Sequence, residues 1–288
     1  ILYKREQRRK KMISLVGRGN TGIKMVEKLS VHNQYKVVTI DSGQEIKECS
    51  SPEEYEAKCP SFKKKFKNLD DEVYLFFSAS GNISGACLRI MEQLKGKNIN
   101  VVCISSDPVT LSAMGSLQQN LVIGVLQEYA RSNMIDNLYL IDNVKIEEML
   151  EDVSLEDYWN QINETIAYIF HTYMYFKNTK PVMEFGHLEK EIANIHTFCA
   201  ISGESKKAFY NLKYITNEIY FFSYRKNEDK GFLKKIKSFI QERSENKKVG
   251  AYIFETTEKN IVTYARVSTH IPQNQKTDLG SLDKPSDL

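Results

Sequence analysis

The stretch that decides the fold is residues 74–95, YLFFSASGNISGACLRIMEQLK. It begins with an apolar, aromatic run that is typical of a short buried strand. A turn of small polar residues follows over 78–85, and from Ala86 onward the apolar side chains recur at helical spacing. The stretch therefore predicts a strand, a glycine-containing turn and a helix. Because the first turn of a helix offers unpaired backbone N–H groups and the positive end of the helix dipole, we expect this turn to bind an anion.

A second glycine turn lies near the beginning of the chain. Residues 13–16 predict a strand, and the turn GRGNTG at 17–22 leads from it into a helix over 23–29. The spacing GxGxxG matches a dinucleotide fingerprint, and Asp41 follows about 20 residues later, where a dehydrogenase would hold a ribose hydroxyl. A nicotinamide-binding Rossmann domain is therefore one hypothesis.

Strands alternate with helices along the first half of the chain. Further strands are expected at 35–40, 99–105 and 138–141, with a helix over 111–131 and a polar, solvated connection over 43–72. This alternation predicts an α/β fold with a mostly parallel sheet covered on both faces, which binds ligands at the carboxyl ends of its strands. Both glycine turns are expected at that edge.

The second half of the chain has a different pattern. One long helix is expected over about 154–175, because large apolar residues recur at three- and four-residue steps, and it can act as a spine between two domains. Beyond it we expect a helix at 205–214 among several strands, and an antiparallel hairpin formed by 249–255 and 261–269. This order predicts a smaller α+β domain at the C-terminal side.

The composition is that of an ordinary globular protein, with 288 residues, 41% hydrophobic residues and a net charge of +3. This charge does not predict direct nucleic-acid binding, and no stretch reaches the roughly 18 apolar residues of a membrane helix. The 5 cysteines are scattered and the histidines form no metal pattern, which indicates reduced thiols and a cytoplasmic protein. Met12 can serve as the native start, in which case the basic arm at 1–11 is not native.

The order of these motifs resembles the tubulin/FtsZ superfamily. That family has a phosphate loop of glycines and threonines between a strand and a helix, and ASGNISGA at 79–86 matches it in length and place. The turn at 17–22 resembles the family's first loop, TID at 39–41 resembles its motif after the second strand, and the long helix resembles the one between its two domains. The resemblance covers about residues 12–270, and the small size is most similar to phage and plasmid members of the TubZ and PhuZ type.

The resemblance implies a site for GTP or GDP, with Mg²⁺ as an expected companion. The implied nucleotide-binding residues are Gly17, Gly19, Asn20, Thr21, Asp41, Ser80, Gly81, Asn82, Ser84, Gly85, Trp159 and Asn163. Among them, Trp159 offers an aromatic face for the base, and the Asn163 amide can both donate and accept at a purine edge. Close backbone approach to the phosphates is less secure here, because Ala79, Ser80 and Ile83 stand where the family has glycine.

The family's catalytic loop, NxDxxD, corresponds to VMEFGHL at 182–188. Glu184 matches the first acid, whereas His187 replaces the second and Val182 replaces the asparagine. A carboxylate can polarise the water that attacks a γ-phosphate, so the resemblance implies a GTPase that is slow or impaired. In the family this loop enters the nucleotide pocket of the next subunit, which implies a head-to-tail homopolymer.

The implied organisation has five parts: a basic arm at 1–11, a nucleotide-binding domain at 12–153, a spine helix at 154–177, a catalytic-loop and α+β domain at 178–271, and a disordered tail at 272–288 that is a candidate adaptor site. The leading hypothesis is a filament-forming GTP-binding protein in a bacterial or host cytoplasm. A degenerate scaffold without GTPase activity is the second hypothesis, because the glycines and the second acid are altered. An NAD(P)-binding Rossmann enzyme is the third.

Overall fold

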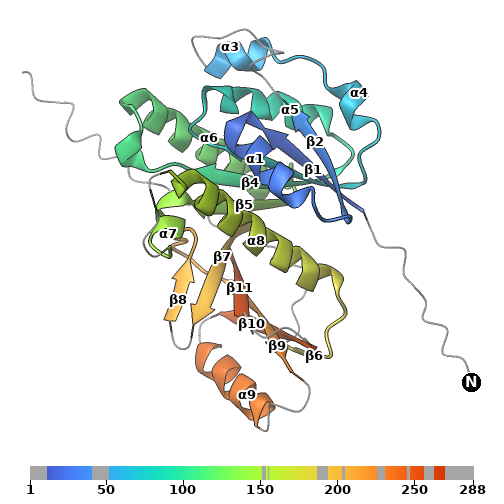
Figure 1. Ribbon diagram of the computed structural model, residues 1–288, viewed down its shortest axis with the longest axis vertical. Helices are drawn as coiled ribbons and strands as arrows, with labels where there is room; N and C mark the ends of the chain where they lie inside the picture. The colour runs from blue at the N-terminus through green and yellow to red at the C-terminus, as the bar shows by residue number, and fades with distance from the viewer. Residues whose placement is uncertain are drawn as a thin grey trace, which may run out of the picture.

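One sheet of 11 strands runs through the molecule, and helices cover it (Figure 1). Along its main path the strands are ordered β2-β1-β3-β4-β5-β7-β11-β9-β10-β6, and β8 pairs with β7 beside that path. The computed structural model describes residues 12–40, 52–150, 154, 156–186, 194–202, 205–225, 231–244, 247–255 and 263–269.

The first half of the chain forms a parallel sheet, as the alternation of strands and helices predicts. Its strands are β1 Ile13–Arg18, β2 Tyr35–Ile40, β3 Glu72–Ser78, β4 Asn98–Ser105 and β5 Asn137–Asp142. The helical segments between and after them are α1 Gly19–Leu29, α3 Pro52–Ala57, α4 Lys63–Phe66, η1 Asn82–Ala86, α5 Cys87–Gln93, η2 Pro108–Thr110, α6 Ala113–Arg131 and α7 Asn143–Glu147. All neighbouring pairs among these five strands are parallel, so the expected α/β class is confirmed.

The central strand β3 is buried on both faces, which explains its continuous apolar run. Tyr74 and Phe76 pack into the core on one face, where their rings meet Phe170 at centroid distances of 5.1 and 4.9 Å. Leu75 and Phe77 belong to the separate core on the other face, which α5 and α6 cover. Successive side chains of a strand point to opposite faces, so both faces of β3 must be apolar.

Helix α1 lies directly on the backbone of the central strands. A Cβ atom added at Gly22 would lie 2.1 Å from the carbonyl oxygen of Phe76, and one added at Gly17 would lie 2.5 Å from the carbonyl oxygen of Gly22. Only residues without a side chain allow this approach. Gly17 and Gly22 therefore set the contact between α1 and the sheet.

The segment between β2 and β3 is more ordered than the expected solvated connection. It contains α3 and α4, and its aromatic residues Tyr55, Phe62 and Phe66 are buried. Phe62 and Phe66 pack against the core beneath α5. The expectation of a solvated connection over 43–72 is therefore wrong for the described part of this segment. The many lysines made the segment look uniformly polar, although its three aromatic residues are buried.

Helix α8, Tyr158–Asn178, crosses between the two halves of the molecule (Figure 1). It begins after Ser154, whose Oγ accepts a hydrogen bond of 3.3 Å from the backbone N–H of Asp157. Its buried side includes Ile166, Phe170 and Tyr173, which pack on the sheet. The helix thus starts one turn after the expected residue 154 and ends three residues beyond the expected residue 175.

The second half adds antiparallel strands to the same sheet. Its elements are β6 Met183–Phe185, β7 Ile195–Ser202, β8 Ser205–Ala208, β9 Asn217–Tyr224, α9 Phe232–Arg243, β10 Lys248–Glu255 and β11 Thr263–Thr269. β11 pairs antiparallel with both β7 and β9, and β6 pairs antiparallel with β10. This mixture confirms an α+β pattern on this side of the chain.

Two expectations for this half are wrong. Residues 205–208 form strand β8, which pairs antiparallel with β7, and not the start of a helix. β10 and β11 do not form a hairpin, because β9 lies between them and pairs parallel with β10. Long-range pairing with β7 and β9 overrides the local pattern in both places.

The two halves of the sheet meet at a narrow junction. β5 and β7 are in register only at Leu138 with Ile195 and at Tyr139 with His196. His196 Nε2 lies 2.7 Å from Asn137 Oδ1, and burial lowers the pKa of His196 to about 3, so the neutral ring donates this hydrogen bond. In the described part of the chain, no helix is both long and apolar enough to cross a bilayer.

Candidate functional site

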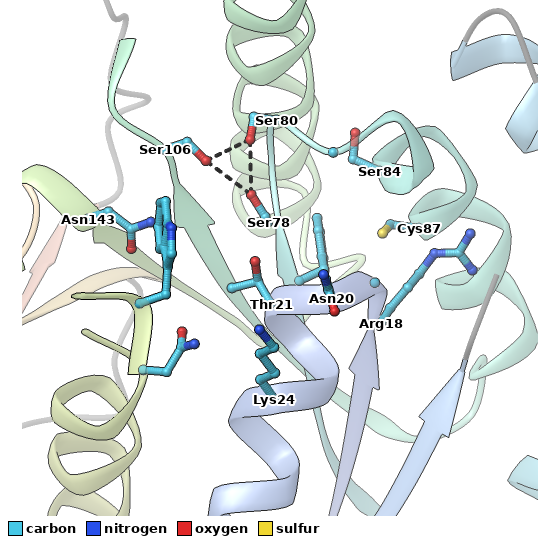
Figure 2. Close-up of a pocket in the computed structure, with 15 residues that line it drawn as sticks. Arg18, Asn20, Thr21, Lys24, Ser78, Ser80, Ser84, Cys87, Ser106 and Asn143 are labelled. Atoms are coloured by element: carbon cyan, nitrogen blue, oxygen red, sulfur yellow. Dashed lines mark hydrogen bonds between the residues drawn. The ribbon is translucent and has the colours of Figure 1, made fainter. Parts of the chain in front are cut away.

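A cavity of about 410 Å³ lies at the carboxyl edge of the parallel sheet. Its walls come from the segment after β1, the turn after β3, the ends of β4 and β5, and the first turns of α8 (Figure 2). The lining residues are Arg18, Gly19, Asn20, Thr21, Lys24, Phe77, Ser78, Ser80, Gly81, Ser84, Cys87, Ser106, Asn143, Trp159 and Asn163. Both glycine turns that the sequence singled out therefore border one cavity.

The strand order explains why the cavity forms at this place. β1 lies between β2 and β3. The chain passes from β1 to β2 on one side, whereas it passes from β3 to β4 on the opposite side. The segments that follow β1 and β3 therefore diverge and leave a crevice at the carboxyl ends of these strands. Such a switch point is where open α/β sheets bind ligands.

Most of the residues expected at the site line this cavity. They are Gly19, Asn20, Thr21, Ser80, Gly81, Ser84, Trp159 and Asn163. Gly17 instead lies beneath α1 as a packing residue, and Gly85 lines a neighbouring apolar hollow beside α6. Asp41 and the side chain of Asn82 lie outside the described part of the structure, as does that of Ile83.

The turn after β3 is held by hydrogen bonds from two directions. Gln118 of α6 donates from Nε2 to the Gly81 carbonyl at 2.7 Å and to Ser84 Oγ at 2.8 Å. On the cavity side, Ser80 Oγ lies 2.7 Å from Ser106 Oγ and 3.1 Å from Ser78 Oγ. These hydroxyls offer donors to an anion, and α6 fixes the turn that carries Ser80 and Ser84.

The end of the cavity at α8 is suited to a flat ring. Trp159 is 51% exposed, so its indole offers a free face, while Asn163 is buried beside it in the next turn of α8. Asn143 follows β5 directly, and its buried Oδ1 has no hydrogen-bond partner in the described structure. Sequence reasoning missed Asn143, although its place at the end of a parallel strand was a usable signal.

The charged residues that line the cavity are both cationic. Lys24 comes from α1, and Arg18 ends β1 with a side chain that is 1% exposed. The Nε, Nη1 and Nη2 atoms of Arg18 have no hydrogen-bond partner among the described residues. Sequence reasoning missed both residues, because it considered only the glycines, Asn20 and Thr21 of this turn.

Sequence comparison finds no protein-family model and no curated protein that match the chain. Solved structures do match it. A dimer of FtsZ from M. jannaschii, described as empty, has a TM-score of 0.66 at 13% identity over 97% of this chain and 96% of that one. A GTPγS-form protofilament of TubZ from Bacillus thuringiensis serovar israelensis has a TM-score of 0.67 at 10% identity over 90% and 86%. The fold is that of the tubulin/FtsZ superfamily.

CetZ from Methanosaeta thermophila shares the same fold, with a TM-score of 0.63 at 11% identity over 89% of this chain and 86% of that one. The expected tubulin/FtsZ-like architecture is thus confirmed across most of the chain. At these identities the likeness concerns the fold alone.

In this tubulin-like fold the expected catalytic acid lies far from the cavity. Glu184 is an exposed residue in β6, where it is in register with Tyr252 of β10. β6 follows the C-terminal end of α8, whereas the cavity lies at its N-terminal end, and a helix of 21 residues spans about 30 Å. Within one chain, Glu184 therefore cannot reach the cavity. His187 lies outside the described residues.

Mg²⁺ is an expected companion of nucleotides in the tubulin/FtsZ fold, but the described lining residues do not fit it. Mg²⁺ is usually held by one or two carboxylates together with phosphates and water, and none of the described residues that line the cavity has a carboxylate. The acids at the carboxyl ends of β4 and β5 cap helical turns: Asp107 accepts from the Val109 N–H and Asp142 from the Val144 N–H. Burial also raises the pKa of Asp142. Among the described residues, no group of three or more acids, histidines or cysteines could hold a metal.

Proposed function

We propose that this chain binds a guanine nucleotide in the cavity and assembles head to tail into filaments. The observation that carries the proposal is the cavity itself, a cationic, hydroxyl- and amide-lined crevice at the β1/β3 switch point with a free indole at one end. The fold supports it, because TubZ structures of this fold are described as GDP-form and GTPγS-form protofilaments.

The residues divide the cavity into a base end and a phosphate end. At the base end, Trp159 would stack on the purine, while the amides of Asn163 and Asn143 would donate and accept at its edge. At the phosphate end, the turn after β1 and the hydroxyl of Ser80 would approach the phosphates. Gly19 has a φ of +63° and open space where a Cβ would be, so it lets the chain turn sharply there.

Hydrolysis in this proposal needs two subunits. Glu184 lies at the other end of α8 from the cavity, so its carboxylate could reach a nucleotide only in a neighbouring copy. A head-to-tail contact is heterologous, and it repeats without closing unless the rotation forms a ring. There the carboxylate would polarise the attacking water. The activity would then increase with protein concentration.

Binding can be tested with the indole, since the chain has a single tryptophan, Trp159. The purified protein would be titrated with GTP, ATP and NADH while tryptophan fluorescence is measured. We expect tryptophan fluorescence to change saturably with GTP, and to reach half of its full change at a lower concentration of GTP than of ATP or NADH. Preferential binding of NADH would contradict the proposal and favour the Rossmann-enzyme hypothesis.

Assembly and turnover need a second experiment. Phosphate release and sedimentation with GTP would be measured over a protein concentration series for the wild type, Glu184→Ala and the matched control Glu255→Ala, an exposed acid at the end of β10. We expect cooperative turnover that Glu184→Ala abolishes and Glu255→Ala preserves. Assembly with bound GTP but without turnover at any concentration would favour a scaffold that lost hydrolysis, a result for which His187 in place of the second acid gives a reason.

A further inference from the structure

The arginine within the first glycine turn is in an unusual state for a charged residue. Arg18 is 1% exposed, it lines the cavity, and three of its nitrogen atoms have no hydrogen-bond partner among the described residues. A buried guanidinium normally has a carboxylate, phosphate or carbonyl partner, because burial of an isolated charge is costly. Its state indicates that an anion outside the described residues completes this site.

The groups beside Arg18 do not supply that anion. Cys87 lies next to it (Figure 2), and the Cys59 thiol is close enough for both the charge of the guanidinium and a weak side-chain contact with it to act on that thiol. Burial raises the pKa of both thiols, to about 12 for Cys87, so both remain neutral although Arg18 acts in the opposite direction. Because no acid among the described residues lines the cavity either, none of these residues offsets the positive charges of Arg18 and Lys24 within it.

The position of Arg18 indicates which part of a ligand it would meet. In Figure 2, Arg18 and Cys87 lie on the side of the cavity away from Asn143, and the hydroxyls of Ser78 and Ser80 lie between these two sides. A nucleotide with its base at Asn143 and Trp159 would therefore extend its phosphate chain past the serines toward Arg18.

We propose that Arg18 receives the terminal phosphate of the bound nucleotide, and that Arg18 and Lys24 neutralise the phosphates so that binding does not need a divalent cation. This inference rests on the proposed nucleotide site. A guanidinium presents donors in a planar fork that matches a phosphate, and charge-assisted hydrogen bonds of this kind are the stronger ones. It also accounts for the absence of a carboxylate among the described lining residues.

The test is calorimetric titration of the full chain with GTP, GDP and GMP, each with EDTA and with Mg²⁺. We expect wild-type affinity to increase with each added phosphate and to change little when EDTA replaces Mg²⁺. Arg18→Gln should weaken GTP binding by about 10- to 100-fold while GMP binding changes little, since GMP lacks the terminal phosphate. Arg18→Lys keeps the positive charge but lacks the planar fork of donors. Its affinity for GTP should therefore lie between those of the wild type and Arg18→Gln.

The matched control is Arg89→Gln, an exposed arginine of the adjacent helix α5 that does not line the cavity. It should bind all three nucleotides as the wild type does, and circular dichroism would show that each variant is folded. Equal wild-type affinities for GTP and GMP, loss of GTP binding in EDTA, or equal weakening of GTP and GMP by Arg18→Gln would overturn the inference while leaving the nucleotide site in place. If the wild type bound no nucleotide at all, the proposed function itself would fail.

Discussion

Replacing Arg18 by methionine should stabilise the protein when no nucleotide is bound. The guanidinium is 1% exposed and its nitrogens lack hydrogen-bond partners in the described structure, so no described residue compensates its charge. Leaving such a charge buried costs about 3 to 5 kcal/mol. Methionine fills much of the same volume at a packing cost of about 1 kcal/mol. The net gain is therefore about 2 to 4 kcal/mol.

This gain is measurable by calorimetry on protein freed of nucleotide, in a buffer without phosphate. A stabilisation of about 2 to 4 kcal/mol would raise Tm by roughly 4 to 12 °C for a chain of this size. Lys24→Met is the matched control, because Lys24 is an exposed cation of the same cavity and its removal should change stability by less than about 0.5 kcal/mol. A lower Tm for Arg18→Met, or an unchanged one, would show that the guanidinium has a partner or is hydrated.

Saturating GTP should remove most of the stability difference between the two proteins. A ligand stabilises the folded state in proportion to the logarithm of its concentration relative to Kd. If the variant binds GTP about 100-fold more weakly, it gains about 2.7 kcal/mol less than the wild type at the same high concentration. The advantage of the variant should then fall by about 2.7 kcal/mol. An advantage of unchanged size in saturating GTP would refute the assignment of the terminal phosphate to Arg18.

Three further predictions concern the core, the base end and the pH dependence. Gly22→Ala should destabilise the protein by about 3 kcal/mol in urea unfolding, because its Cβ would lie 2.1 Å from the Phe76 carbonyl oxygen. Gly19→Ala should destabilise it by only about 1 to 2 kcal/mol, because the space around Gly19 is open and only its φ of +63° is unfavourable for alanine. Trp159→Ala should weaken GTP binding by about 10- to 100-fold in calorimetry through lost stacking, and Trp159→Tyr should restore most of it; equal binding by all three proteins would exclude stacking. His196 has a folded-state pKa of about 3, below the ordinary value of 6.5, so the unfolded chain binds the extra proton first and the stability present above pH 6.5 is lost as the pH falls toward 3. His196→Gln should reduce the slope of unfolding free energy against pH in that window by up to about 1.4 kcal/mol per pH unit, and an unchanged slope would contradict the burial of a neutral ring.

The first half of the fold follows from local sequence signals. β3 is an apolar run bounded by polar residues, and the glycines at 17 and 22 permit the close contact of α1 with the strand. Parallel pairing then places the ends of β1 and β3 at one edge, so a shared cavity could be anticipated from two separate turns.

The second half depends on contacts that a local pattern does not contain. Residues 205–208 are polar enough for a helix end, yet they pair antiparallel with β7. β9 lies between β10 and β11, and its residues Tyr220 and Phe222 pack in the same core as Ile236 of α9. Such pairings join residues far apart in the sequence, so periodicity alone does not reveal them.

The site was anticipated where backbone conformation determines it and missed where burial determines it. Gly19 and the serine-rich turn were visible as turn chemistry. Arg18 was not, because an arginine in a turn is ordinarily exposed and only the packed structure shows that it is buried. Asn143 required knowing that β5 ends at the same cavity.

The narrow junction between β5 and β7 has a mechanical consequence. These strands are in register at 2 residue pairs, compared with 6 between β4 and β5 and 7 between β7 and β11. Tyr173 of α8 packs against both Tyr139 of β5 and Phe198 of β7, so this helix bridges the line where the sheet has the fewest paired residues. Bending between the two halves of the sheet would therefore require the aromatic side chains beneath α8 to repack, which couples the hinge of the molecule to the helix that begins at the cavity.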